Sequence, residues 1–183
     1  MNEEIIIAGF GGQGVLSMGK IMAYAGMIQQ MEVSWMPSYG PEMRGGTANV
    51  TVILSDERIS SPILNLFDTA ILLNQQSMDK FEKTVKPGGV LLYDTNGITR
   101  HPQRKDIQIY QVDAAEESAK MLTTKTFNMI VLGAYLKIKP LITTENIIQG
   151  IRESLPERHH HLIPVNEDAL KRGMEIVRKQ SLS

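Results

Sequence analysis

The sequence predicts an α/β fold, a Rossmann-like, open and mostly parallel sheet with helices on both faces and room for one antiparallel edge hairpin. Short β-branched runs alternate with helical patterns along the chain, and the first run passes through a glycine-rich turn into a helix. The length of 183 residues suits one domain, at about 150 residues per domain. We therefore expect residues 1–183 to form a single domain.

The first elements are marked by a change of hydrophobic period. Residues 5–8 are apolar, as in a buried strand, and the next helix is apolar nearly all round, which predicts burial on more than one side. Residues 33–36 predict a second strand. Residues 37–46 predict a loop because they contain two prolines and three glycines. Residues 47–54 alternate with period 2, as a strand with one better-buried face does.

The later elements continue the alternation. Asn166 is expected to cap the last helix, with Arg178 and Lys179 at its negative C-terminal end. The predicted strands are 68–73, 90–93 and 107–112, with a hairpin return at 58–60, and the predicted helices are 77–85, 114–122, 127–137, 144–154 and 167–179.

Composition excludes several classes of protein. With 19 basic and 20 acidic side chains the chain has no basic excess for a nucleic acid, so we expect no nucleic-acid partner. The absence of cysteine excludes a disulfide scaffold, a thiolate zinc site, a cysteine-held iron–sulfur cluster and a cysteine nucleophile. The acidic start and short apolar runs predict a cytoplasmic protein without a membrane span. The 11 methionines suit core packing, or an interface where they surround the motifs below.

The first candidate site is the glycine-rich turn GFGGQG, with Gly9, Gly11, Gly12, Gln13 and Gly14. It matches G-x-G-x-x-G between a strand and a helix. Glycines let backbone N–H groups approach a ligand closely, and the positive end of the following helix favours an anion. The alternative is that these glycines serve only close packing of helix and strand.

A dinucleotide site needs a second feature, an acidic residue at the end of the second strand. Residues 34–38 are SWMPS and hold no carboxylate, while Glu32 precedes the strand. NAD binding is therefore the weaker interpretation of the turn.

The second candidate site is the loop that follows, expected beside the glycine turn at the carboxyl edge of the sheet. Its arginine offers a forked donor and its glutamate an acceptor. The alternative is an ordinary surface loop with a local ion pair. Its candidate residues are Tyr39, Gly40, Pro41, Glu42, Arg44, Gly45, Gly46 and Thr47.

Other polar residues are weaker candidates. Asn74 and Asp94 end two predicted strands and could contact a ligand, or serve as turn and capping residues. Three adjacent histidines at 159–161 point in different directions, so we expect a solvated loop or helix end there, and no metal site. No nucleophile–base spacing is found, and we assign no catalytic residue.

The two motifs together carry a resemblance. GFGGQGV, SYGPEMRGGTANV, DTAILLNQQSMDKF and VKPGGVLLYD closely resemble the gamma subunit of 2-oxoacid:ferredoxin oxidoreductases, most strongly over residues 5–94. The resemblance implies a subunit of an enzyme that oxidatively decarboxylates a 2-oxoacid. It is closest to the 2-oxoglutarate type, and the branched-chain 2-oxoacid and pyruvate types remain open.

The resemblance also implies a division of labour. Thiamine diphosphate, magnesium and iron–sulfur clusters are expected on alpha and beta partner subunits, with a ferredoxin-like delta subunit left open and ferredoxin as electron acceptor. Coenzyme A is expected to be contacted at the subunit interface by the glycine turn and the loop, and the isolated chain is expected to be inactive. The rival hypotheses are a stand-alone NAD(P)- or nucleotide-binding Rossmann protein and a purely structural or regulatory domain.

Overall fold

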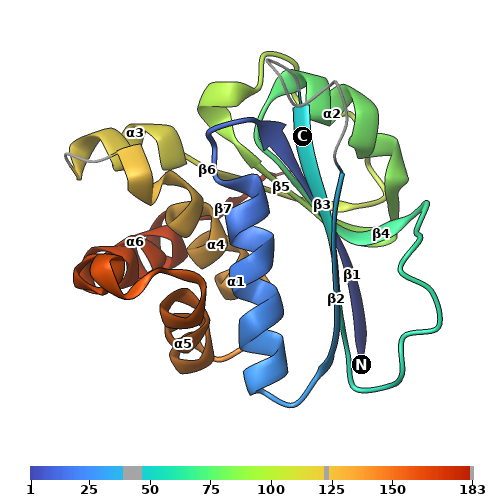
Figure 1. The fold of residues 1–183 in the computed structure, drawn as a ribbon. Coiled ribbons are helices and arrows are strands. Elements are labelled where there is room, and N and C mark those ends of the chain that lie inside the picture. The colour runs from blue at the N-terminus through green and yellow to red at the C-terminus, as the bar shows by residue number, and fades with distance from the viewer. Residues whose placement is uncertain (39–46, 122–123, 182–183) are drawn as a thin grey trace.

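A seven-stranded sheet forms the centre of the molecule (Figure 1). The computed structural model describes residues 1–38, 47–121 and 124–181. Across the sheet the strands are β2 (Glu32–Ser38), β3 (Thr47–Ser55), β1 (Asn2–Phe10), β4 (Phe67–Leu72), β5 (Val85–Asp94), β6 (Gln108–Val112) and β7 (Arg178–Lys179).

The strands β1, β4, β5 and β6 are parallel, whereas β3 runs antiparallel to both β1 and β2, and β7 antiparallel to β6. The predicted α/β class is confirmed. The antiparallel edge pair is β2 with β3, and the hairpin return predicted at residues 58–60 is wrong, because no strand forms there. The strand beside β1 is the antiparallel β3, where a Rossmann order would place a parallel strand.

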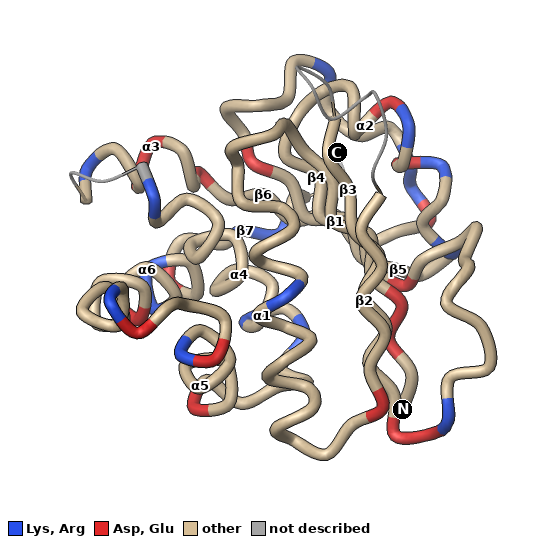
Figure 2. The backbone as a smooth tube through the Cα atoms, in the orientation of Figure 1, with Lys and Arg blue, Asp and Glu red and all other residues tan. Residues whose placement is uncertain are grey.

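Helices cover both faces of the sheet, as predicted (Figure 1). One face carries most of them, and α2 packs on the other through Met78 and Phe81. Charged residues are frequent on α5 and α6, and sparse along β2 (Figure 2). The helices are α1 (Val15–Ile28), α2 (Gln75–Phe81), α3 (Ala114–Lys120), α4 (Phe127–Ile138), α5 (Thr144–Ser154) and α6 (Ile163–Ile176), with 3-10 turns η2 (Glu82–Thr84), η3 (Thr95–Gly97), η4 (Thr124–Thr126) and η5 (Glu157–Leu162).

The apolar helix α1 is buried between two layers, which confirms the prediction from its sequence. One side faces β2 and β3, where a Cβ on Gly19 would lie 2.8 Å from Val50. Its other side faces α5, where Gly150 approaches the carbonyl oxygen of Ile21. No helix among the described residues has the length and apolar character needed to cross a bilayer.

The helices α4 and α6 cross in close backbone contact. A Cβ built on Gly173 would collide with the carbonyl oxygen of Ile130, and a Cβ on Gly133 with the carbonyl oxygen of Leu170. Each glycine thus faces the backbone of the other helix. The crossing depends on both residues having no side chain.

The last helix differs from its prediction at both ends. It begins at Ile163, with Pro164 in its first turn, and Asn166 lies inside it, donating to the carbonyl oxygen of Leu162 at 3.0 Å. Proline suits a first helical turn because its missing N–H is not needed there. Arg178 and Lys179 lie beyond the helix and form β7, so their predicted place at a helix end is wrong.

Glu117 fastens α3 to α6. Its carboxylate accepts from Arg172 Nε at 2.7 Å and from Lys120 Nζ at 2.9 Å, and these bonds lower the pKa of Glu117 to about 2. The ordinary pKa, 4.5, applies to the unfolded chain. The stabilisation that the lowered pKa of Glu117 gives the folded chain is therefore present above about pH 4.5 and is lost as the pH falls towards 2.

We accordingly expect the natural chain to have a higher free energy of unfolding than Glu117→Gln at pH 6. This difference should disappear near pH 2. Urea unfolding over this pH range measures it. Glu116→Gln is the matched control, because the Glu116 carboxylate is 67% exposed and pairs only with Lys120 among the described ion pairs. A gap that stays constant from pH 6 to pH 2.5 would contradict this role of Glu117.

Candidate ligand site at the carboxyl edge of the sheet

The carboxyl ends of β1, β4, β5 and β6 meet at one edge of the sheet because these strands are parallel and adjacent. The glycine turn follows β1 at this edge, Asn74 follows β4, and Asp94 ends β5. Open α/β sheets commonly place their ligands at this edge.

The glycine turn has the backbone that its sequence predicts. Gly12 and Gly14 have φ angles of 92° and 74°, in the left-handed region that favours glycine. Gly14 directly precedes α1, whose first turn holds no acidic residue and no side-chain cap. Among the described residues, no side chain therefore caps the N–H groups at the start of α1. They form a donor end that suits an anion.

Gln13 holds the turn against the sheet. Its Oε1 accepts from the backbone N–H of Phe10 at 2.6 Å, and its Nε2 donates to the carbonyl oxygen of Leu73 at 3.2 Å. One side chain therefore links the end of β1 to the end of β4. A Cβ on Gly9 would lie 2.5 Å from Gln13 Oε1, so glycine at position 9 leaves the room that this side chain occupies.

Asp94 and Asn74 both act as capping residues. Asp94 is 1% exposed, and its Oδ1 accepts from the N–H groups of Ala114 at 2.9 Å and Ala115 at 3.2 Å. Burial raises the pKa of its carboxyl, against the effect of these N–H groups. The Oδ1 of Asn74 accepts from Ser77 N at 2.7 Å. The capping alternative is confirmed for both residues, and ligand contact stays a prediction.

A cleft of about 230 Å³ opens at this edge. Gly12 and Gln13 line one side of it, and Asp94 and Asn96 line another, with Ser118 and Phe127 completing the wall. The cleft thus brings the glycine turn together with a carboxylate and an amide, and the donor end of α1 directly follows that turn. It suits a ligand that carries an anionic group together with hydroxyl or amino groups.

The cleft also includes residues that the sequence did not single out. Asn96, Ser118 and Phe127 come from η3, α3 and α4, which are remote in sequence from the glycine turn. Asn128 lies nearby and donates from Nδ2 to the carbonyl oxygen of Gly14 at 3.3 Å. None belongs to a short motif, so only the tertiary fold identifies them.

The second candidate loop lies largely outside the described residues. This applies to its candidates Tyr39, Gly40, Pro41, Glu42, Arg44, Gly45 and Gly46. Its flanks are described. Thr47 pairs with Phe10, and Ser38 pairs with Asn49, so both flanks reach the edge where the glycine turn begins.

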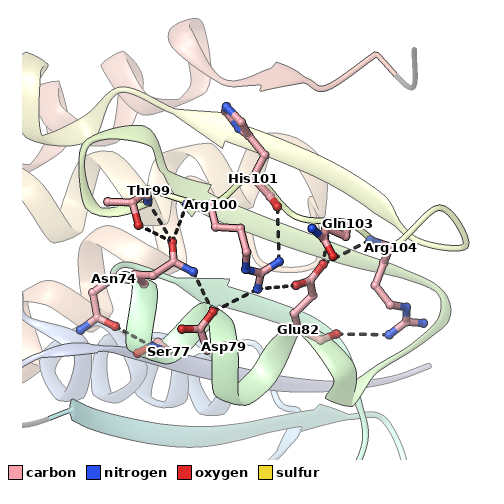
Figure 3. A network of polar contacts seen from close by, with 10 residues as sticks. Asn74, Ser77, Asp79, Glu82, Thr99, Arg100, His101, Gln103 and Arg104 are labelled. Atoms are coloured by element: carbon pink, nitrogen blue, oxygen red, sulfur yellow. Dashed lines mark hydrogen bonds and ion pairs between the residues drawn. The ribbon is translucent and has the colours of Figure 1, made fainter.

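A second polar cluster is formed by residues that do not line the cleft (Figure 3). Gln75 Oε1 accepts from the N–H groups of Thr99 and Arg100, and Glu82 accepts from Gln103 N and pairs with Arg100 at 3.0 Å. These bonds hold residues 99–104 against α2 and η2. The cluster explains how this segment is fixed, and it needs no ligand.

The three histidines lie in η5, which agrees with the predicted loop or helix end. His160 Nε2 lies 3.0 Å from the carbonyl oxygens of both Arg152 and Leu155. Over residues 1–38, 47–121 and 124–181, no group of three or more His, Asp or Glu side chains could hold a metal ion.

The fold and the cleft define the class: a Rossmann-like α/β domain with a cleft at the carboxyl edge of its sheet. Residues 4–176 match the family model described as pyruvate ferredoxin/flavodoxin oxidoreductase. The chain belongs to this family.

Known proteins agree with this assignment. The ketoisovalerate oxidoreductase subunit VorA of Methanothermobacter marburgensis is 35% identical over 96% of this chain and 37% of its own length. The 2-oxoglutarate synthase subunit KorC of Methanocaldococcus jannaschii is 32% identical over 86% of each chain. A keto/oxoacid ferredoxin oxidoreductase gamma subunit from Geobacter sulfurreducens has a similar crystal structure, with a TM-score of 0.83 and 29% identity over 96% of both chains. This chain therefore spans little more than a third of the VorA protein.

Proposed function

We propose that this chain is the gamma subunit of a multi-subunit 2-oxoacid:ferredoxin oxidoreductase. The reaction most in keeping with it converts 2-oxoglutarate and coenzyme A to succinyl-CoA and CO₂, with the electrons passing to ferredoxin. The observation that carries the proposal is the family match over residues 4–176, joined to a glycine turn that Gln13 fixes beside a cleft at the carboxyl edge of the sheet.

The redox and thiamine chemistry is assigned to partner subunits. This chain has no cysteine to ligate an iron–sulfur cluster, and its described residues offer no metal-ligand set for the magnesium of thiamine diphosphate. No step that uses these groups is assigned to this chain. Alpha and beta subunits would hold them, and ferredoxin would accept the electrons. Whether the complex also contains a delta subunit is left open.

The part assigned to this chain is to shape the coenzyme A side of the shared site. The N–H groups at the start of α1 suit a phosphate group. Asp94 and Asn96 offer acceptors for hydroxyl or amino groups at the other side of the cleft. Arg44 and its neighbours in the second loop are proposed to face the same region.

The substrate is proposed to be 2-oxoglutarate, in keeping with the KorC relative. The VorA relative supports a branched-chain 2-oxoacid as the alternative, and pyruvate is a further one. Substrate choice would rest with the thiamine-binding subunits, and this chain would share it by association.

Anaerobic affinity purification from the native cell tests the proposal. We expect a tag on this chain to recover larger chains that contain thiamine diphosphate and iron–sulfur clusters. The complex should reduce ferredoxin in a coenzyme A-dependent reaction, fastest with 2-oxoglutarate. Faster reduction with 2-oxoisovalerate or pyruvate would keep the subunit role and correct the substrate.

Recovery of this chain alone would contradict the subunit role. In that case a fluorescence titration with NADH separates the rival hypothesis. Micromolar binding would favour a stand-alone NAD(P)-binding protein, whereas the proposed function expects no binding.

A further inference from the structure

The two edge strands of the sheet, β2 and β7, differ in length and charge. At one edge β7 has only two residues, Arg178 and Lys179, both basic and exposed. Short, basic edge strands are a common protection against pairing with another chain. At the other edge β2 has seven residues, and its only charged side chain is Glu32 at the first position. The β2 edge therefore lacks the short length and the basic side chains of the β7 edge, and Pro37 protects it only near its C-terminal end.

The open edge of β2 presents backbone groups. Proline is tolerated in an edge strand where its missing N–H would face away from the neighbouring strand. The N–H and C=O groups of successive residues in a strand point to alternate sides. Residues two and four positions before Pro37 therefore also direct these groups away from β3. These residues are Val33 and Trp35. Val33 pairs with Leu54 and Trp35 with Val52, so both side chains face α1. Neither side chain therefore covers the outer edge of β2.

The surface around β2 is apolar and poor in charge. Three of the exposed large hydrophobic side chains of the described residues belong to β2 or to the end of the helix that precedes it. Met36 on β2 is 38% exposed, and Met27 and Ile28, at the end of α1, are 62% and 41% exposed. Of the seven residues of β2, only Glu32 is charged. Figure 2 shows the contrast between β2 and the charged helices α5 and α6.

We propose that the β2 edge, defined as Val33–Met36 with the flanking Met27 and Ile28, docks an extended, uncharged strand of a neighbouring subunit. The strand would continue the sheet beyond β2 through backbone hydrogen bonds, as in β-augmentation. Depletion of charge is typical of the buried core of a protein interface. This inference rests on the proposed function, because it names the surface by which the gamma subunit joins its complex.

The position of β2 favours a different chain over a second copy of this one. The C-terminal end of β2 reaches the same edge of the sheet as the glycine turn, and Phe10 there is 42% exposed. A subunit seated along β2 would therefore also reach the cleft that it helps to complete. A second copy paired antiparallel through its own β2 would direct its glycine turn to the opposite end, away from this cleft.

Hydrogen–deuterium exchange on the full chain, alone and in the assembled enzyme, tests the pairing directly. Within residues 32–38, the outward amides of Val33 and Trp35 should exchange at least about tenfold more slowly in the complex than in the isolated chain. The peptide that contains Arg178 and Lys179 should not change, because β7 lies at the opposite edge.

A pair of lysine variants tests the surface. Met36→Lys should weaken recovery of the partner chains by about tenfold or more, because a lone charge would be buried in the interface. Ser34→Lys, on the same face of β2, should act in the same direction. Gln149→Lys is the matched control, since it adds the same charge at an exposed position of α5 and should leave recovery unchanged. Thermal unfolding of each isolated variant verifies that it folds.

The outcomes separate this inference from the proposed function. Failure to recover any partner chain contradicts both. Recovery of the partner chains with residues 32–38 unprotected, and with folded Met36→Lys and Ser34→Lys still bound, overturns the docking surface and leaves the subunit role standing. An isolated chain that forms a dimer with residues 32–38 protected also overturns it, in favour of a second copy.

Discussion

Replacing Gly173 with alanine is expected to lower the free energy of unfolding by about 2 to 3 kcal/mol. The new Cβ would collide with the carbonyl oxygen of Ile130, and because this atom is backbone, α4 and α6 must move apart. Alanine gains at most about 1 kcal/mol from its better helix propensity, which is too little to offset the lost packing. Gly133→Ala should act in the same way through Leu170.

Urea unfolding measures this effect, with Lys171→Ala as the control on the same helix. Lys171 is 59% exposed and pairs with Glu167 four residues away, so its loss should change the free energy of unfolding by less than about 0.5 kcal/mol. A change below 0.5 kcal/mol for Gly173→Ala would mean that the helices separate at little cost, and would contradict the close crossing.

Replacing Gln13 with alanine is expected to raise the KM for coenzyme A of the assembled enzyme by about tenfold. The variant removes two hydrogen bonds that fix the glycine turn, each worth about 1 kcal/mol, and 1.4 kcal/mol corresponds to a factor of ten. Gln13 is a positioning residue here. The KM for the 2-oxoacid should change by less than twofold, because that substrate is assigned to the partner subunits.

Gln29→Ala is the matched control for this experiment. Gln29 also links two elements through both ends of its amide, donating to the carbonyl oxygen of Leu141 at 2.7 Å and accepting from Thr143 N at 3.0 Å. It lies at the far end of α1 from the glycine turn. Equal increases in the KM for coenzyme A in both variants would show a general loss of stability and would contradict a specific role of the turn.

Local sequence signals predicted much of this fold. The glycine turn, the buried α1 and the main parallel strands follow from hydrophobic period and glycine placement, which act over a few neighbouring residues. Such local signals do not predict the position of β3 between β1 and β2. Strand order depends on pairing between residues such as Ile6 and Thr51, which are remote in sequence. The two residues of β7 are too few to show any period.

Some residues of the candidate site could likewise be predicted from local motifs, and others could not. Gln13 was a candidate because it lies in a recognisable motif, and the structure adds the reason, a bond that reaches Leu73. Asn96 and Phe127 line the cleft only because η3 and α4 come together in the tertiary structure. The start of α6 carried a local signal, Pro164, but the polar run from Asn166 was the more conspicuous one.

The unequal edges of the sheet also bear on how the chain is produced in a cell. A chain made in excess of its partners would keep β2 uncovered, and an uncovered edge strand with exposed apolar side chains favours non-specific aggregation, which differs from a defined dimer. We therefore expect a low soluble yield when this chain is expressed alone, and a higher one when its partner chains are expressed with it. The supply of partners would then set how much of this chain persists, so the subunits would be held in balance by folding chemistry as well as by gene expression.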